Sequence, residues 1–337
     1  MSEIACKYCS SDNIVKDGTN TGEQYYLCRS CNKRFNLKDA LVHMKTPVSA
    51  VAASVSMYYR GMSISNIRQE LEQIYHLDVS DFAIYNWIER FTKDAIKITE
   101  NYHPDVGYVW MADETVINIA GKQYWLLDVI DVKTRFLLAS KLSPHRWMED
   151  INDVLVEAYQ RSGKIPKSIM TDHLEGYTRA IPSTFGSGAK HVQVKKFAAK
   201  PNNNIIERMQ GTIKSRTKIM RDLKSLDTAK LILDGFFVYY NYFRPHETLS
   251  EPGNDTTPAQ KANINFPYSD WEQLIRNSQI AKQMPAARFD IPKLPVHAMT
   301  KIEKRKEHER IRSRNKLAKA REGKPSVQQI GRPRKRK

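Results

Sequence analysis

Three acidic residues stand where they could hold divalent metal ions between them. Asp113 lies inside the apolar run YVWMADETV, Asp172 follows the apolar segment SIMT, and Glu207 lies in a segment rich in amides and cations, with 34 residues between it and Asp172. Carboxylates that converge repel one another unless cations lie among them. Two Mg²⁺ (or Mn²⁺) ions roughly 4 Å apart would neutralise them, activate a water or a 3′-hydroxyl, and stabilise a leaving oxygen. We therefore expect a catalytic metal site for cutting and joining DNA strands.

The segment around Glu207 has the spacing of a helix. Its predicted buried stripe is Ile206, Met209, Ile213 and Met220. Glu207 borders this stripe, Lys214 shares its face seven residues on, and Gly211 between them leaves room for a phosphate. The cations that we expect to contact the DNA backbone are Arg208, Arg216 and Lys218. An acid in a first helical turn can also simply complement the helix dipole, but the two aspartates favour the metal-ligand interpretation.

Other acids compete for the same role. Asp131 begins an AspValLysThr segment and is typical of a turn. Glu114 neighbours Asp113 and, by strand alternation, should point to the opposite side of the sheet. Asp128 stays open as a further candidate. Structural roles are expected for the histidines and tyrosines near these motifs: His173, His191, His246, Tyr239, Tyr240 and Tyr242.

The elements that must position the three acids can be read from the hydrophobic period. Residues 106 to 142 contain three apolar, β-branched runs joined by two turn signals, which predict three consecutive antiparallel strands. A helix is expected at 146–161. It is followed by a short strand ending at Asp172, a helical segment, the strand HVQV, the helix of Glu207 and an aromatic helix at 228–243. The order β-β-β-α-β-α-β-α is that of an RNase H-like α/β fold, which we assign to a catalytic domain at 105–265.

All four cysteines fall in two CxxC pairs near the N-terminus: Cys6, Cys9, Cys28 and Cys31. Two such pairs can present four thiolates to one tetrahedral zinc ion, so residues 1–40 are expected to form a zinc ribbon with a strand at 25–27. Four thiolates leave no open coordination position, which argues against a catalytic zinc. The alternatives are a structural knuckle that does not touch nucleic acid, and unliganded thiols.

Residues 45–100 change to a helical period. Three short helices are predicted, separated at Gly61 and at the LDVSD turn, with Ser65 and Ser80 as N-caps. This layout suits a helix-turn-helix whose last helix enters the major groove of DNA. The exposed side chains of that helix form no convincing base-reading face, so a helical linker or dimer bundle remains an alternative.

The charge of the chain points to nucleic acid. The formal net charge is +17, and the residues from Lys301 onward, with 16 Lys or Arg and 4 Glu, contribute +12 of it. We interpret 266–337 as a linker and a basic DNA-binding tail. Arg332 and Arg334 resemble part of an AT-hook, although nonspecific phosphate binding is an alternative. No apolar run reaches the ~20 residues needed to span a bilayer and no secretory signal opens the chain, which favours a soluble intracellular protein without a membrane.

Five motifs in order resemble the DDE transposases of bacterial and archaeal insertion sequences, relatives of retroviral integrase. They are ADET, TDHLEGYTRAI, NNNIIERMQGTIKSR, YFRPHETL and TPAQKANI, and the resemblance runs from about residue 47 to 264. It implies Asp113, Asp172 and Glu207 as the metal-binding triad and Lys214 as a contact to the transposon end. Gln210 stands where several relatives place a histidine, and only some members carry a zinc ribbon.

The resemblance also implies an activity and partners. We expect hydrolysis at the 3′ ends of an insertion sequence and strand transfer into target DNA, recognition of terminal inverted repeats, and an oligomer of at least two subunits on double-stranded DNA. The expected location is the cytoplasm of a prokaryote, in association with the nucleoid. The alternatives are a catalytically idle, domesticated DNA-binding regulator, and an RNase H-fold nuclease that does not join ends.

Overall fold

The computed structural model describes residues 4–9, 11–20, 23–36, 44–194, 204–219 and 223–281. The expected linker and basic tail, including Arg332 and Arg334, lie outside these residues apart from the first part of the linker. No helix among the described residues is long and apolar enough to cross a membrane.

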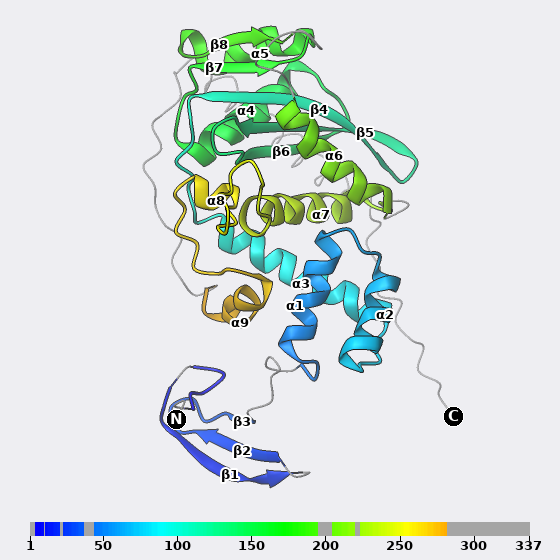
Figure 1. Cartoon of the computed structure of the whole chain (residues 1–337), viewed down its shortest axis with the longest axis vertical. Helices are drawn as coiled ribbons and strands as arrows, with labels where there is room; N and C mark the ends of the chain where they lie inside the picture. Colours follow the sequence, from blue (N-terminus) through cyan, green and yellow to red (C-terminus); the bar gives the residue numbers. More distant parts are fainter. Residues whose placement is uncertain are drawn as a thin grey trace, which may run out of the picture.

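The N-terminal segment folds into a small antiparallel sheet of its own (Figure 1). Its strands are β1 (Ile14–Asn20), β2 (Glu23–Cys28) and β3 (Arg34–Asn36), in the order β1-β2-β3. The buried cluster beneath them consists of Cys6, Tyr26, Cys28 and Phe35. The strand predicted at 25–27 is therefore confirmed as the middle of β2. A cluster this small cannot stabilise a domain without a further cross-link.

Three helices follow, as the sequence predicts: α1 (Val48–Tyr59), α2 (Ile64–Tyr75) and α3 (Asp81–Thr99). Ser80 caps α3, because its side chain accepts a hydrogen bond from the Ala83 N–H. The predicted cap at Ser65 is wrong. Ser63 caps α2 by accepting from the Asn66 N–H, so the helix begins two residues earlier and Ser65 lies in its first turn.

A five-stranded mixed sheet forms the centre of the molecule, with the strand order β6-β5-β4-β7-β8 (Figure 1). The strands are β4 (Val109–Ile119), β5 (Lys122–Asp131), β6 (Leu137–Ser143), β7 (Ser168–Thr171) and β8 (Lys190–Gln193). The first three are antiparallel neighbours, and β7 and β8 add to β4 in parallel. Three antiparallel strands followed by two parallel crossovers make the RNase H-like arrangement, so the predicted fold class is confirmed.

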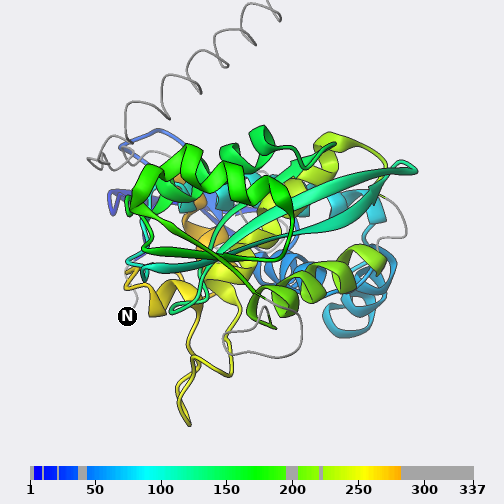
Figure 2. The same cartoon turned by 90° about the horizontal axis from the view of Figure 1, so that it is seen from above.

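Helices lie on both faces of this sheet. The helices after β6 are α4 (Met148–Ser162), α5 (Glu175–Phe185), α6 (Asn204–Ile219), α7 (Leu226–Val238), α8 (Pro258–Lys261) and α9 (Trp271–Ala281), of which α9 packs on α1 and α3 rather than on the sheet. Helix α4 packs on β5, β6 and α5, whereas α6 packs on β4. Figure 2 shows α6 on the opposite side of the sheet from α5. Glu207, which lies on α6, can therefore contribute its carboxylate only on the face of the sheet that α6 covers.

The aromatic helix predicted at 228–243 differs from the structure at its end. The α-helix stops at Val238, and a π-helical turn, η2 (Tyr239–Phe243), follows. Within η2 the fully buried Asn241 accepts a hydrogen bond from the Leu137 N–H and donates one to the Leu137 carbonyl, both at 2.9 Å. This side chain thus satisfies the backbone at the start of β6 and anchors η2 to the sheet.

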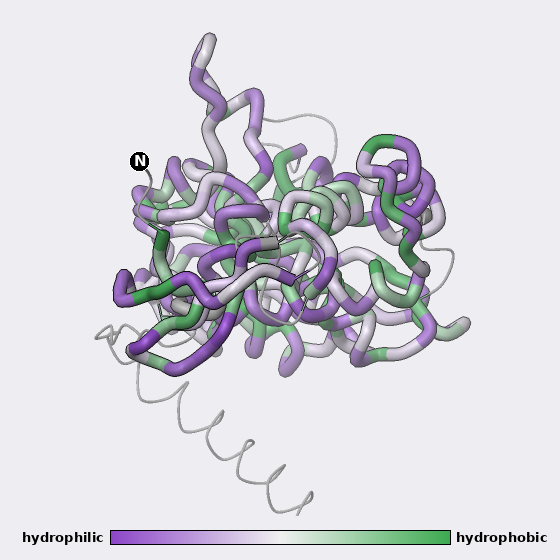
Figure 3. Tube along the Cα trace, turned by 90° about the horizontal axis from the view of Figure 1, so that it is seen from below, coloured by the Kyte–Doolittle hydropathy of each residue, from purple (hydrophilic) through white to green (hydrophobic). Residues whose placement is uncertain are grey.

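Helices α1 to α3 share one hydrophobic core with the central sheet and with α7 and α9. The Tyr59 hydroxyl contacts Thr92 Oγ1 at 2.7 Å, and both lie against Gly235 of α7, where a Cβ would come within 2.0 Å of the Tyr59 oxygen. Only glycine permits this approach. The segment between η2 and α8 projects away from the core and is largely hydrophilic (Figure 3).

Candidate active site

Asp113 lies mid-way along β4, as predicted, with its Cα paired to that of Asp128 on β5. Its side chain is partly buried. Burial, together with the negative charges of Glu114, Asp172 and Glu207, raises the pKa of the Asp113 carboxyl to about 7. No described residue forms an ion pair with Asp113. Its environment therefore disfavours a bare carboxylate and favours a proton or a cation.

Asp172 follows directly after β7, also as predicted. The parallel register pairs Met111 with Met170, so two residues further on Asp113 and Asp172 come side by side at the end of β7. The Leu174 N–H donates a 2.9 Å hydrogen bond to Asp172 Oδ1, which fixes the carboxylate at this position. Two acids far apart in sequence are thus adjacent because their strands are neighbours.

Glu114 joins this pair, which the sequence reasoning did not anticipate. Carboxylate oxygens of Asp113, Glu114 and Asp172 all lie within 4.8 Å of one another. Glu114 also contacts Arg146, with Nη1 at 2.8 Å from Oε1, and accepts a 3.3 Å hydrogen bond from the Tyr177 hydroxyl. Alternation correctly turns it toward the α5 side, but its long side chain still reaches the cluster. The adjacent acids in the ADET motif were the available signal.

Glu207 lies in the first turn of α6 and is exposed. It is not a member of the cluster of three oxygens, although its charge raises the pKa of the Asp113 carboxyl. Lys214 is exposed on the same helix, and a Cβ at Gly211 would meet no atom within 4 Å, so the space between them is open. The structure therefore places Glu207 beside the two aspartates but does not bring all three predicted ligands into contact.

Asp128, the open candidate, is fully buried on the α6 side of β5. Ser140 Oγ donates to Asp128 Oδ1 at 2.7 Å, and Gln210 Nε2 lies 3.5 Å from Oδ2. Burial raises the pKa of the Asp128 carboxyl to about 7. Gln210, where relatives carry a histidine, is thus a contact between α6 and the sheet rather than a solvent-facing group.

The carboxylate cluster suits divalent cations. Oxygen donors are those that Mg²⁺ and Mn²⁺ prefer, and metal–oxygen distances of about 2.1 Å place neighbouring ligand oxygens on one ion roughly 3 to 4 Å apart. The limit of 4.8 Å among the three residues leaves little rearrangement for binding one ion or two. Asp113 and Asp172 are the members without a cation partner among the described residues, so they are the better ligand candidates.

The predicted DNA contacts on α6 divide into two groups. Arg208, Lys214 and Lys218 are exposed, as a phosphate contact requires. Arg216 is only 3% exposed, and its guanidinium lies 3.9 Å from the centre of the Tyr58 ring on α1. Burial lowers the pKa of Arg216. The expectation that Arg216 contacts the DNA backbone therefore disagrees with the structure, because this cation is occupied by packing between α6 and α1.

The four cysteines converge as predicted. Cys6 Sγ lies 3.7 Å from Cys31 Sγ, Cys9 Sγ lies 3.6 Å from Cys28 Sγ, and all four sulfurs lie within 4.8 Å of one another. Zinc–sulfur bonds of about 2.3 Å in a tetrahedron place sulfurs about 3.8 Å apart. The ribbon thus has the geometry of a structural zinc site.

The other residues considered at the sequence level have structural contacts. Asp131 Oδ2 accepts bonds from the Thr134 N–H and hydroxyl, each at 2.7 Å, which confirms its role in a turn. His191 Nε2 contacts Thr171 Oγ1 at 2.8 Å, and His173 is exposed. The three tyrosines of η2 are at most 8% exposed, so core packing is confirmed for them.

Comparison with known proteins gives a family for the central part of the chain. Residues 107–246 match the family model of a DDE domain of IS240-type transposases. The search of curated proteins returned no match.

Among solved structures, the magnesium complex of the HTLV-2 integrase catalytic core is similar, with 16% identity and a TM-score of 0.37. The similarity covers 48% of this chain and 97% of that one. The BIV integrase catalytic core has 13% identity and a TM-score of 0.36, with 47% and 94% covered. The family match thus identifies a DDE domain over residues 107–246, the part of the chain that contains Asp113, Asp172 and Glu207.

Proposed function

We propose that the chain is a transposase that uses Asp113, Asp172 and Glu207 to hold Mg²⁺ or Mn²⁺, hydrolyses the 3′ ends of an insertion sequence and transfers them to target DNA. The observation that carries the proposal is the register of β4 and β7, which sets Asp113 and Asp172 side by side, two carboxylates that form no ion pair with any described residue. When bound there, divalent ions supply Lewis-acid activation of an attacking hydroxyl and neutralise charge on the leaving oxygen.

The chain's own residues orient and shield this reaction. The Leu174 N–H holds the Asp172 carboxylate, and Arg146 and Tyr177 hold Glu114 beside it. Glu114 is therefore a positioning residue, because its charge is compensated by Arg146. Glu207 completes the ligand set from α6. The open space over Gly211, on the same helix, leaves room for a DNA strand to approach.

The test is strand joining by the full chain. A labelled DNA end from the element's terminal repeat is incubated with plasmid target and Mg²⁺, and nicked and joined products are separated on a denaturing gel. Asp113→Asn, Asp172→Asn and Glu207→Gln should each lower joining at least ~100-fold while DNA binding persists, because each removes a metal ligand. Glu175→Gln, an exposed acid paired with Arg179, is the matched control.

The outcomes separate the alternatives. Nicked without joined products would indicate a nuclease, and neither product with intact DNA binding would indicate an idle regulator. Wild-type joining by Glu207→Gln would remove Glu207 from the ligand set.

Recognition of the terminal repeats is assigned to the zinc ribbon and to α1–α3. Asn86 is exposed on α3, the last of the three helices and the one that we propose as the recognition helix. Asn86→Ala should weaken binding to the repeat relative to random duplex by about tenfold, since one good side-chain–base contact contributes ~1–3 kcal/mol. Footprinting of the repeat and scattering measurements of the complex would test this and the proposed oligomer of at least two subunits.

The exposed cations of α6 and the basic tail are assigned to the DNA backbone. Lys214→Met should reduce the slope of log affinity against log salt by about one, as should be expected for one lost phosphate contact. Deleting residues 300–337, which contain Arg332 and Arg334, should reduce it further. An unchanged slope after the deletion would separate the tail from DNA.

A further inference from the structure

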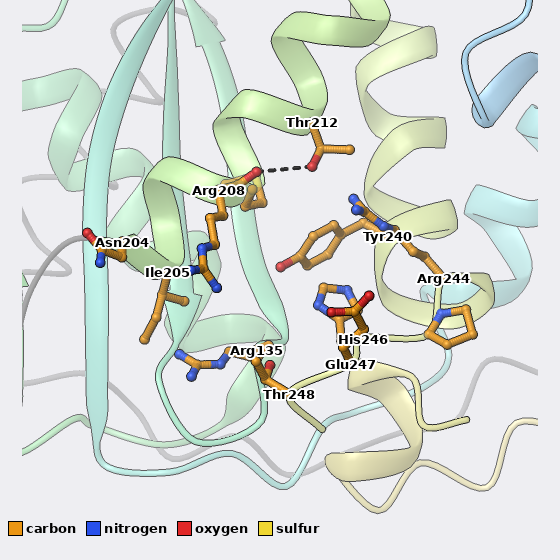
Figure 4. A pocket seen from close by; sticks show the side chains of 12 residues that line it. Arg135, Asn204, Ile205, Arg208, Thr212, Tyr240, Arg244, His246, Glu247 and Thr248 are labelled. Carbon is orange, nitrogen blue, oxygen red and sulfur yellow. Dashed lines mark hydrogen bonds between the residues drawn. The ribbon is translucent and has the colours of Figure 1, made fainter. Parts of the chain in front are cut away.

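A cationic cavity lies beside the start of α6, close in the chain to Glu207. It is a cavity of about 540 Å³, here named the arginine pocket and defined by Arg135, Arg208, Tyr240, Arg244 and His246. Figure 4 shows these side chains around one space between α6, the β5–β6 turn and the segment after η2. Three guanidinium groups from three separate parts of the chain thus line one concave surface.

Among the residues that line the arginine pocket, Glu247 is the acid that accompanies these arginines. No described residue forms an ion pair with Arg135, Arg208 or Arg244. Arg135 Nη1 is buried without a hydrogen-bond partner among the described residues. Burial lowers the pKa of Arg135, and the nearby Arg208 charge lowers it further. Clustered cations with unmet donors cost stability, so the arrangement favours an anionic ligand.

The remaining walls of the pocket suit more than a bare anion. His246 packs edge-on against Tyr240, with ring centroids 4.6 Å apart, and its Nε2 is buried with no hydrogen-bond partner in the described part of the chain. Burial lowers the pKa of His246 to about 4, so the imidazole is neutral at physiological pH. Asn204 and Glu247 also line the cavity. These groups offer an apolar surface and hydrogen-bonding atoms for a base edge, beside cations for a phosphate.

The position of the pocket connects it to the carboxylates. Arg208 follows Glu207 in the chain, and the charge of Asp128, paired with Asp113, acts on the Tyr240 hydroxyl. A DNA strand that runs past Glu207 would therefore reach the arginine pocket within one turn of α6. A stacked duplex presents its phosphates on a convex surface, whereas entry into a concave cavity requires a nucleotide to leave the stack.

We propose that the arginine pocket binds one unpaired nucleotide of the DNA strand next to the catalytic carboxylates, with Arg135 and Arg244 on its phosphate. The proposal rests on the proposed function, because it takes DNA to be the polymer in front of Glu207. It adds a nucleotide-binding site that is separate from the metal ligands and from the exposed lysines of α6.

The test is binding without chemistry, using the full chain in Mg²⁺-free buffer. Fluorescence anisotropy compares a blunt terminal-repeat duplex with the same duplex carrying an unpaired 3′ extension. Wild type should bind the extended probe about tenfold more tightly, as expected for charge-assisted contacts to one phosphate. Arg135→Gln and Arg244→Gln should abolish that preference, Arg135→Lys should restore part of it, and Arg276→Gln, an exposed arginine paired with Glu272, should retain it.

A neutral methylphosphonate at one position of the extension locates the contact. In wild type it should cause the same loss as Arg135→Gln, and the two changes combined should not add. Equal loss on blunt and extended probes would replace the proposal with a duplex contact. Stabilisation by inorganic phosphate with no effect on DNA would replace it with a free-anion site.

Two further results bear on the proposal. An unaltered preference in folded Arg135→Gln and Arg244→Gln would overturn it, whatever the joining assay shows. If wild type prefers the extended probe, the two variants lose that preference, and wild type nevertheless never joins DNA, the result would support the pocket and refute the proposed function.

Discussion

Replacing Asp128 by asparagine should make the catalytic core more stable than wild type at alkaline pH. Asp128 is fully buried, and burial raises the pKa of its carboxyl from 3.8 to about 7. Asparagine keeps the shape of the side chain and cannot ionise. It can still accept from Ser140 Oγ, and the Gln210 amide can turn to accept from the new NH₂ group.

The magnitude follows from the shift in pKa. Below about pH 4 the carboxyl is protonated in the folded and unfolded chain, so it contributes no pH dependence. Between about pH 4 and pH 7 the folded chain keeps a proton that the unfolded chain releases, and the free energy of unfolding falls as the pH rises. Above pH 7 the full cost applies. About three pH units at about 1.36 kcal/mol each give ~4 kcal/mol as an upper value.

The assay is urea unfolding followed by tryptophan fluorescence at several pH values from 5 to 9. Asp128→Asn should be more stable than wild type by at most about 1.6 kcal/mol at pH 5, and this difference should grow by up to about 2.7 kcal/mol between pH 5 and pH 8.5. Asp227→Asn, an exposed acid in the first turn of α7, is the control and should change stability by less than about 1 kcal/mol. Parallel pH profiles for wild type and Asp128→Asn would refute the reasoning, because they would mean that residue 128 does not titrate on unfolding.

Three further predictions concern packing and ligands. Asn241→Leu should lower the free energy of unfolding by about 2–4 kcal/mol in urea titrations, because it leaves the buried N–H and carbonyl of Leu137 without partners. Arg216→Met should leave the salt dependence of DNA binding unchanged and cost little stability, since it removes a buried cation; a reduced slope like that of Lys214→Met would return Arg216 to the DNA contacts. Cys28→Ser, or removal of zinc by a chelator, should expose the N-terminal ribbon to limited proteolysis, and a resistant ribbon would contradict a structural zinc site.

The strands and the two aspartates were predictable because their signals are local. An apolar β-branched run fixes a strand, and an acid inside or just after it falls at a known place in the sheet. The position of Asp113 on β4 and of Asp172 after β7 follows from this alone. Their adjacency needed the fold as well, because only the parallel register of β4 and β7 brings them together.

Other features depend on tertiary contacts that no local pattern contains. Ser63 and Ser65 are two residues apart, and either hydroxyl could accept the capping hydrogen bond of α2, so the local sequence does not decide between them. The reach of Glu114 into the cluster depends on Arg146 and Tyr177, which come from later parts of the chain. The arginine pocket is formed by three separate segments, as far apart in the chain as Arg135 and Arg244, so its cations could not be grouped from spacing.

Arg216 is different, because the sequence contained the signal for its burial. Residues 206, 209, 213 and 216 repeat at three and four residues, so Arg216 continues the apolar stripe that was predicted for this helix. The prediction of a DNA contact rested on the positive charge of Arg216, whereas its position in the stripe indicates burial. The burial is favourable because the guanidinium lies against the face of the Tyr58 ring.

Helix α6 is where these contacts meet, and the period of the helix decides what each residue does. Gln210 and Arg216 lie on the buried stripe and hold the helix to β5 and α1, which fixes its rotation about its own axis. With that rotation fixed, Glu207 and Lys214 share the exposed face, and Arg208, one residue further round, borders the arginine pocket. Because neighbouring residues on a helix are turned by about 100° from each other, any other rotation would withdraw Glu207 from Asp113 or Arg208 from the pocket. The packing of α6 thus sets its chemistry.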